Sequence, residues 1–216
     1  MDIKIDLHTH SILSPDGGLS ENDYKSLFQH KALNVIAVTD HNSLKYAQQL
    51  QKKLGNKIIV GEEVCSKQGE IIGLFLTDEI PAGLTAAETV KQIKKQNGVV
   101  CIPHPFETVR QGISKNVLDE IIEDVDLIEV FNGRSLQTNM RKFALDATRE
   151  YAKVGVANSD AHCRLGIGRT YNLISTMPTK KSLVDLLAKG TRNEKGSFWL
   201  AYLCPKINRI KKYFNL

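Results

Sequence analysis

Histidine and acidic residues form five clusters between His8 and His162, and these residue types bind divalent metals. The clusters are His8 with His10, Asp40 with His41, Glu62 with Glu63, His104, and Asp160 with His162. Neutral imidazole and carboxylate together are the ligand set of zinc, manganese and iron. In a His-x-His pair on an extended segment, both rings point to the same side, because side chains alternate with a period of two. The sequence therefore predicts chemistry that depends on bound metal.

Each cluster alone also has an ordinary structural interpretation. A lone His-x-His pair is compatible with surface or core histidines. Asp40 could cap a helix that begins near Ser43, and the prolines around His104 could set a rigid loop. Taken together, the five clusters favour a metal site, because every cluster follows or ends a strand-like run. Five of the six histidines belong to the clusters, and His30 lies apart from them in a predicted helix.

Eight short apolar runs predict the strands that position these clusters. Such runs suit strands buried on both faces of a parallel sheet. Helical segments lie between most of them, with Ser20 as an N-cap and Thr85 to Glu88 as a capping box. This β-α pattern predicts one α/β domain, doubly wound or closed into a barrel, with the clusters at the carboxyl ends of its strands. The runs are Ile3–Leu7, Val35–Thr39, Ile58–Val64, Ile71–Leu76, Val99–Ile102, Leu127–Phe131, Val154–Ala157 and Asn172–Ser175.

Composition and cysteine usage are those of an ordinary globular domain. The chain has 216 residues, of which 42% are hydrophobic and 25% charged, so folding requires neither a disulfide nor a structural metal. No signal-peptide pattern opens the chain, and no run approaches the ~18–20 apolar residues that span a bilayer, so we expect a cytoplasmic protein. The cysteines form no Cys-x-x-Cys pair, which argues against a zinc ribbon or thioredoxin-like motif. We expect most of them to be reduced small hydrophobes. They are Cys65, Cys101, Cys163 and Cys204.

The clusters resemble the motifs of the polymerase and histidinol phosphatase (PHP) family of metal-dependent phosphoesterases. The similarity runs in order from residue 6 to about residue 170, and residues 177–216 carry no recognisable motif. It consists of Asp6-Leu-His8-Thr-His10-Ser11 with Ser14-Pro-Asp16-Gly17, then Thr39-Asp40-His41, Gly61-Glu-Glu63-Val64, Pro103-His104-Pro105 and Asn158-Ser-Asp160-Ala-His162.

This resemblance implies a distorted (βα)7 barrel of the TIM-like type, as a single domain over residues 1–216, with two to three divalent metals (Zn, Mn or Fe). Carried over by position, one metal is held by His8, His10, Glu63 and Asp160. Glu63 also binds a second metal and so bridges the two, and His104 is a further ligand of the second. Asp16, His41 and His162 hold the third. Where many relatives have a histidine before the fourth strand, this chain has Glu70, and a carboxylate there favours Mn or Fe over Zn.

The resemblance also implies hydrolysis of a phosphoester by attack of a metal-bound hydroxide. Arg134 and Arg169 are candidates for bidentate contact with phosphate, and either Asp160 or His162 could protonate the leaving group. Two alternatives remain open at this point. The same site could hydrolyse an amide or ester, or the chain could be a metal-binding module without activity.

The expected partner is a small, anionic, phosphorylated metabolite or nucleotide, which the net charge of +5 suits. Nucleic acid is expected only as a short or terminal substrate, because aromatic and basic residues are not interleaved. Without long insertions, the site should be rather open. In the C-terminal segment, Ile207, Ile210, Tyr213 and Phe214 share one helical face, opposite Arg209 and Lys212. We interpret it as a final helix that closes the barrel, the alternatives being an anionic membrane surface or a second subunit.

Overall fold

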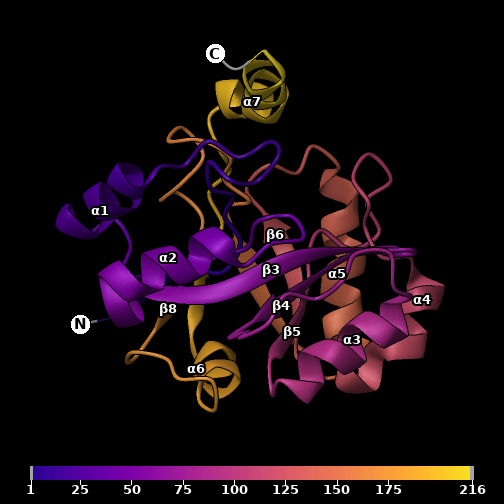
Figure 1. Ribbon diagram of the computed structural model, residues 1–216. Coiled ribbons are helices and arrows are strands. Elements are labelled where there is room, and N and C mark those ends of the chain that lie inside the picture. Colours follow the sequence, from indigo (N-terminus) through magenta and orange to yellow (C-terminus); the bar gives the residue numbers. More distant parts are fainter. Residues whose placement is uncertain (1, 215–216) are drawn as a thin grey trace.

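The computed structural model describes residues 2–214 and contains a nine-stranded sheet with helices packed around it (Figure 1). The strands are β1 (Ile3–Asp6), β2 (Val35–Val38), β3 (Ile58–Ser66), β4 (Gly69–Leu74), β5 (Val99–Ile102), β6 (Leu127–Asn132), β7 (Val154–Asn158), β8 (Tyr171–Ile174) and β9 (Thr191–Asn193). The helices are α1 (Glu21–Gln29), α2 (Lys45–Leu54), α3 (Ala86–Lys95), α4 (Lys115–Ile121), α5 (Thr138–Glu150), α6 (Leu183–Lys189) and α7 (Cys204–Tyr213), with 3-10 turns η1 (Gly55–Lys57), η2 (Ile122–Asp124) and η3 (Trp199–Leu203).

The strands follow the order β7-β6-β5-β4-β3-β2-β1-β8-β9 and curve into a nearly closed barrel. The barrel closes through contacts between β7, at one end of this order, and β8, near the other end. The Asn172 side chain of β8 accepts a hydrogen bond from the Ala157 amide at 2.9 Å and donates one to the Ala157 carbonyl at 2.8 Å. Beyond β1, Thr9 forms a parallel bridge with Ala161. The predicted single-domain α/β barrel is therefore confirmed, and the eight predicted runs coincide with β1 to β8 to within about two residues.

The sheet is not wholly parallel, which corrects the sequence-based expectation. Strands β1, β2 and β3 are parallel, as are β5, β6 and β7, but β4 pairs antiparallel with both β3 and β5. Only Lys67 and Gln68 connect β3 to β4, and so short a connection allows a hairpin but no crossover. β8 is also antiparallel to β1 and to β9, whose short polar sequence carries no apolar pattern from which it could be predicted.

Both faces of the sheet are buried, which explains why the strand sequences are almost continuously apolar. In β2, Val35 and Ala37 face the interior of the barrel, whereas Ile36 and Val38 pack under the surrounding helices. Leu183 and Leu187 of α6 join the interior cluster, and α6 lies at the bottom of the barrel in Figure 1. The end of the barrel opposite to α6 carries the metal-binding residue types.

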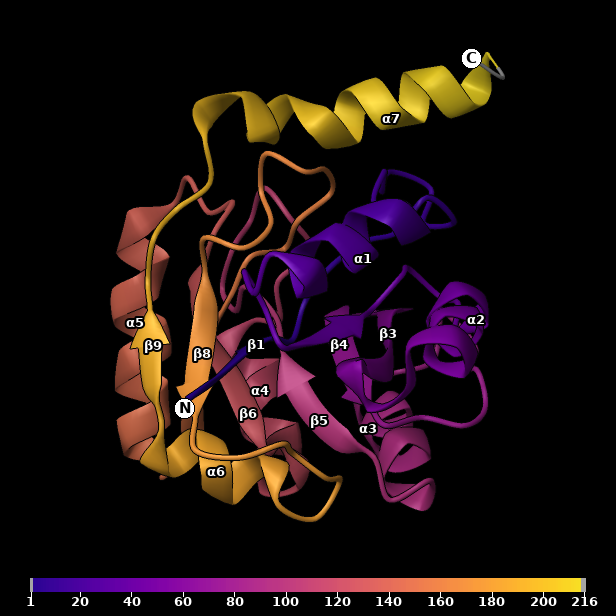
Figure 2. The ribbon, with the colours of Figure 1, turned by 90° about the vertical axis from the view of Figure 1, so that its left-hand side faces the viewer.

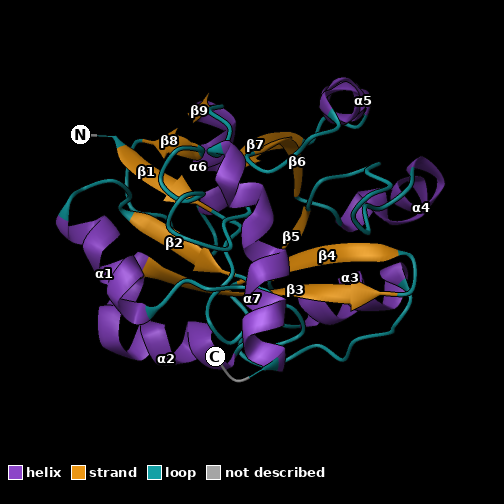
Figure 3. Ribbon diagram, turned by 90° about the horizontal axis from the view of Figure 1, so that it is seen from above, coloured by secondary structure: helices purple, strands orange, loops and turns teal. Residues whose placement is uncertain are grey.

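Residues 177–214 form more than a helical extension. They include α6 and strand β9, and α7 crosses the open end of the barrel (Figures 2 and 3). A final helix that closes the barrel was expected to bury its apolar face and leave its lysines in water, and this orientation is wrong. The polar side of α7 faces the barrel, and Ile207, Ile210, Tyr213 and Phe214 are 45–82% exposed. The last two positions of the predicted segment 177–216 lie outside the described residues. Between residues 2 and 214, no helix is long and apolar enough to cross a membrane.

The cysteines divide into two kinds. Cys101 is buried in the core of the barrel as a free thiol, as expected, and Cys65 is also free. Cys163 and Cys204 instead form a disulfide, which corrects the expectation for these two. Their separation of 41 residues gave no sign of it, because the fold alone brings their Cα atoms to 6.1 Å. This disulfide joins α7 to the loop after β7.

Candidate metal centre

The histidines and acids predicted to bind metal converge at one end of the barrel. They are supplied by the ends of β1, β2, β5 and β7, by β3 and β4, and by the loop that carries Asp16. Nearly all are buried: His8 and His10 have no exposed surface, and Glu63 is 1% exposed. Most of them line a cavity of about 360 Å³. His30 lies exposed after α1 and does not line this cavity, as predicted.

The deepest group consists of His8, His10, Glu63 and Asp160. The two Nε2 atoms of His8 and His10 lie 3.1 Å apart. Glu63 Oε2 lies 3.3 and 3.2 Å from them, and Asp160 Oδ1 lies 3.5 and 3.3 Å from them. Donor atoms bound to one ion at about 2.0–2.2 Å are themselves roughly 3–3.5 Å apart. This group therefore fits a divalent ion.

The other oxygen of Glu63 faces a second group. Glu63 Oε1 lies 3.1 Å from His104 Nε2, which is 3.6 Å from Glu70 Oε2. Glu70, which departs from the family pattern, is thus close enough to His104 and Glu63 to share an ion with them. Cys65 Sγ is a neighbour that sequence reasoning missed, 3.9 Å from Glu70 Oε1 and 4.0 Å from His41 Nδ1.

Asp16, His41 and His162 form a third group on loops at the mouth of the site. Asp16 Oδ1 lies 3.3 Å from His162 Nε2 and 3.7 Å from His41 Nε2. The ring of His10, from the deepest group, stacks on the rings of both His162 and His41, with centroid distances of 4.1 Å and 4.7 Å. The third group is therefore in contact with the deepest one, and the predicted residues occupy one continuous cluster.

Buried carboxylates behind the cluster orient it. Glu129 Oε1 lies 3.2 Å from His8 Nδ1, and Glu129 Oε2 accepts a hydrogen bond of 2.7 Å from the His104 amide. Contacts of this kind fix the ring orientation of a metal-ligating histidine. The pairing of β6 with β7 shifts register between Glu129 and Phe131, and an irregularity of this kind changes the direction in which the neighbouring side chains point. Asp40 accepts a 2.6 Å hydrogen bond from the Ser11 amide, so it holds the His10 loop and does not cap a helix.

The backbone is strained at two of the converging residues. His104 has a φ of 28° and Asp160 a φ of 51°, in a region that non-glycine residues rarely adopt. Such conformations cost of order 1–3 kcal/mol and persist where surrounding contacts enforce them, often at functional sites. Here the hydrogen bond from the His104 amide to Glu129 is one such contact.

Crowding of acids and imidazoles shifts several pKa values. Burial lowers the pKa of His10, but hydrogen bonds to Asp160 and Glu63 outweigh it and raise the pKa to about 9. Burial and repulsion by Glu63 and Asp160 raise the pKa of Glu70 to about 8. Burial and nearby positive charge lower the pKa of His162 to about 3. Several carboxylates in one buried site require compensating positive charge, which protons or divalent ions supply.

Two arginines reach this cluster, and one predicted arginine does not. Arg134 Nη1 lies 2.9 Å from His162 Nδ1 and 3.1 Å from Asp160 Oδ1. Arg110, which sequence reasoning missed, pairs with Asp160 and lines the cavity. It lies in a turn after the Pro103-His104-Pro105 motif, and nothing in its local sequence distinguishes it from a surface arginine. The structure does not bring Arg169 into the site, because its guanidinium stacks on Phe198 at 3.9 Å and donates to the Gly196 carbonyl.

Comparison with known sequences identifies related proteins. A family model described as PHP-associated matches residues 140–191, which include Asp160 and His162. Two uncharacterized proteins of Methanocaldococcus jannaschii are similar to the chain. One is 37% identical over 185 residues, covering 83% of this chain and 73% of the relative. The other is 34% identical over 144 residues, covering 61% of this chain and 82% of the relative.

Solved structures with the same fold are more distant in sequence. A two-domain protein of Bacteroides vulgatus, containing a predicted PHP-like metal-dependent phosphoesterase, superposes with a TM-score of 0.72 at 16% identity, over 97% of this chain and 70% of that one. A lesion-specific endonuclease of Pyrococcus furiosus gives 0.67 at 18% identity, over 89% and 57%. An amidohydrolase of Chromobacterium violaceum with bound sulfate gives 0.58 at 16%, over 88% and 98%. At these identities the similarity is one of fold.

Proposed function

This chain belongs to the polymerase and histidinol phosphatase (PHP) family, and from that membership we propose that its buried centre holds up to three divalent ions and hydrolyses a phosphate ester. The observation that carries the proposal is the placement of Glu63. Its Oε2 faces His8 and His10 while its Oε1 faces His104. A carboxylate placed in this way suits a bridge between two ions.

We assign the ions to the three groups described above. His8, His10, Glu63 and Asp160 would hold the first ion, and Glu63, His104 and Glu70 the second. Asp16, His41 and His162 would hold the third. When bound, such ions lower the pKa of water to near neutrality and stabilise negative charge on a phosphoryl oxygen. With Glu70 as a ligand in place of a histidine, we expect Mn or Fe to be preferred over Zn.

Arg134 is the residue that we propose for contact with the phosphate. Its Nη1 already lies against Asp160 and His162, and its Nε is buried without a hydrogen-bond partner among residues 2–214. An arginine has five N–H donors, and among residues 2–214 no hydrogen bond engages Arg134 Nη2. This group is therefore available to an anion in the cavity that Arg134 lines. Arg110 is more fully engaged, since Glu107 binds its Nε and Nη2. We therefore assign Arg110 to holding Asp160 and Arg134 to the substrate.

The size of the cavity supports a small substrate. A volume of about 360 Å³ admits a phosphomonoester or a terminal nucleotide. Helix α7 contributes Pro205 and Arg209 to its wall, so the site is less open than the sequence suggested. A long duplex would have to displace α7, and we propose nucleic acid only as a short or terminal substrate.

A hydrolysis screen tests this function. Phosphomonoesters, cyclic phosphates, dinucleotides and N-acyl compounds are incubated with protein loaded separately with Mn, Zn or Fe. We expect hydrolysis of at least one phosphoester, to free phosphate from a monoester or to a monoester from a diester, and none by a Glu63→Gln variant prepared in parallel. Hydrolysis restricted to the N-acyl compounds would instead favour amide hydrolysis, the reaction class of the fold neighbour from Chromobacterium violaceum. No hydrolysis by fully loaded protein would contradict both.

A further inference from the structure

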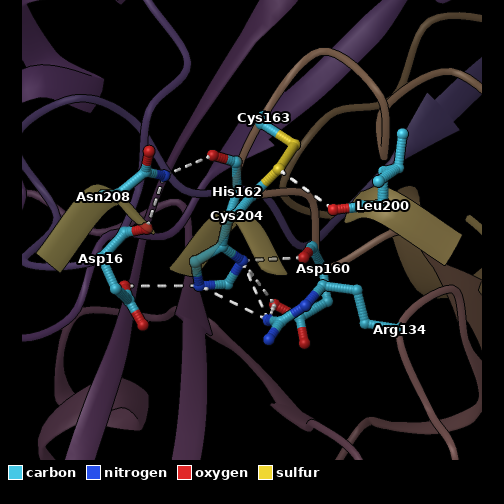
Figure 4. Close-up of a disulfide and its surroundings, with 8 residues drawn as sticks. All are labelled: Asp16, Arg134, Asp160, His162, Cys163, Leu200, Cys204 and Asn208. Carbon is cyan, nitrogen blue, oxygen red and sulfur yellow. Dashed lines mark hydrogen bonds and ion pairs between the residues drawn. A yellow bond between two sulfur atoms is a disulfide. The ribbon is translucent and has the colours of Figure 1, made fainter. Parts of the chain in front are cut away.

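Helix α7 makes polar contacts with two of the loops that carry the third group, those of Asp16 and His162. The Asn208 side chain donates hydrogen bonds of 2.8 Å to the Asp16 carbonyl and 2.9 Å to the His162 carbonyl, so one amide joins both loops (Figure 4). Lys212 Nζ donates to the carbonyls of Ser14 and Gly17 on the Asp16 loop. A Cβ at Gly18 would lie 2.8 Å from Asn208 Nδ2 and 3.1 Å from the His162 carbonyl oxygen, so a larger residue there would crowd the contact of Asn208 with this loop.

The two oxygens of Asp16 have different partners. Oδ1 faces His162 and His41 at 3.3 and 3.7 Å, whereas Oδ2 accepts a 2.8 Å contact from Arg209 Nη2. Arg209 therefore occupies the oxygen that points away from the imidazoles and fixes the rotation of the carboxyl group. An outer partner of this kind typically changes metal affinity by about 10- to 100-fold when removed.

The disulfide attaches α7 beside the same group. Cys163 follows His162 directly in the chain, and Cys204 is the first residue of α7 (Figure 4). Of the apolar side chains of α7, Pro205 is buried near its start, whereas Ile207, Ile210 and Tyr213 are exposed. The covalent bond at one end and the contacts of Asn208, Arg209 and Lys212 therefore determine where α7 lies.

We propose that Asn208 and Arg209 are positioning residues for the third metal group, and that this group is complete only while the Cys163–Cys204 disulfide is intact. The inference rests on the proposed function, since it assigns Asp16, His41 and His162 to an ion. A dithiol reductant would break the one S–S bond, transfer two electrons and two protons to leave two thiols, and itself become a disulfide. Release of α7 then removes the link that Asn208 makes between the two loops. Within residues 2–214, no hydrogen bond or ion pair joins α7 to the side chains of the deepest group.

Metal content measured on matched variants tests the inference. Wild type, Asn208→Ala, Cys204→Ser and the control Lys206→Ala are dialysed against one fixed free concentration of Mn²⁺ and analysed for bound metal. The Lys206 side chain is exposed on the same helix and makes no hydrogen bond or ion pair among residues 2–214. We expect three equivalents in wild type and Lys206→Ala, and two in the other variants, with the third equivalent weakened about 10- to 100-fold. Trypsin should also cleave α7 faster in Cys204→Ser, at Lys206, Arg209, Lys211 and Lys212.

The outcomes separate this inference from the proposed function. Three equivalents at wild-type affinity in both Asn208→Ala and Cys204→Ser would overturn the inference, as would a wild type that binds two equivalents and no third. Loss of all metal from either variant, with the circular dichroism of wild type, would also overturn it, because the effect would not be confined to the third group. Less than one equivalent in wild type would instead contradict the proposed function itself.

Discussion

The deepest group and the third group of the site contain similar side chains but are built differently. His8, Glu63 and Asp160 lie in a strand or within two residues of its end, and His10 follows on the loop after β1. All four are at most 2% exposed. Asp16 and His162 stand on loops that are tied together by Asn208 of α7. The barrel thus fixes one half of the site through its own hydrogen-bonded frame, and a peripheral helix fixes the other half.

This difference indicates where the site is robust and where it can be adjusted. Side chains on a packed sheet are held within narrow limits by their neighbours, and sites on such elements are more rigid than sites on loops. Loops have lower local stability and open more readily. Substitutions in the deepest group should therefore abolish function outright, whereas changes around the third group should modulate it.

The largest expected effect is that of Glu63→Gln. Removing the charge of the carboxylate that faces both His8 and His104 should lower turnover by more than about 100-fold, above the loss typical of an outer partner of a metal ligand. Circular dichroism should show a folded protein, because Glu63 fills no apolar core. His30→Gln is the control and should retain wild-type activity. A normal rate in Glu63→Gln together with an inactive His30→Gln would show that the active site is not at the end of the barrel proposed here.

A smaller loss is expected from Glu129→Gln. The amide can still contact the His104 backbone but no longer offers His8 a charged partner, so the first ion should bind about 10- to 100-fold more weakly. Competition with a chelating dye measures this affinity. Unchanged affinity would show that packing around the His8 ring is sufficient to orient it.

Metal affinity should increase with pH. A metal binds the deprotonated donor, so at neutral pH it must displace a proton from His10, with a pKa of about 9, and from Glu70, with a pKa of about 8. Each displaced proton weakens the apparent affinity up to about tenfold per unit of pH below its pKa. Apparent affinity for Mn²⁺ should therefore rise from about pH 6 to 8.5, and less steeply in Glu70→Gln. A flat profile in wild type would contradict this account.

The smallest effect concerns the identity of the metal. Glu70→His should preserve activity while moving the preference from Mn or Fe toward Zn, since imidazole suits zinc better. Glu70→Ala should lose affinity for the second ion. Rates and metal content are compared for each loaded form. If both variants match wild type, Glu70 is not a ligand and another neighbour, such as Cys65, completes the second group.

Local sequence patterns predicted much of the barrel and the convergence of the site. Ser20 and Thr85 cap α1 and α3 as their sequences indicate, and the apolar runs mark β1 to β8. The direction of β4 could not be read in this way, because an apolar run buried on both faces looks the same in a parallel or an antiparallel strand. The brevity of the β3–β4 connection was the available signal.

Features that depend on distant parts of the chain were not predictable. The disulfide, the contact of Arg110 with Asp160 and the orientation of α7 all depend on tertiary proximity. For α7, the sequence shows two faces but not which one packs. The usual preference for burying the apolar face was overridden by hydrogen bonds of Asn208 and Lys212 to loop carbonyls. The site was therefore predicted best where strands position it and least where α7 does.

Elemental analysis tests the central claim most directly. Protein purified without chelator, and a sample reconstituted with Mn, Zn and Fe, are each analysed for metal per chain, with Glu63→Gln alongside. The account predicts two to three equivalents of divalent transition metal in wild type and a reduced content in the variant. Less than one equivalent in wild type after reconstitution would contradict it.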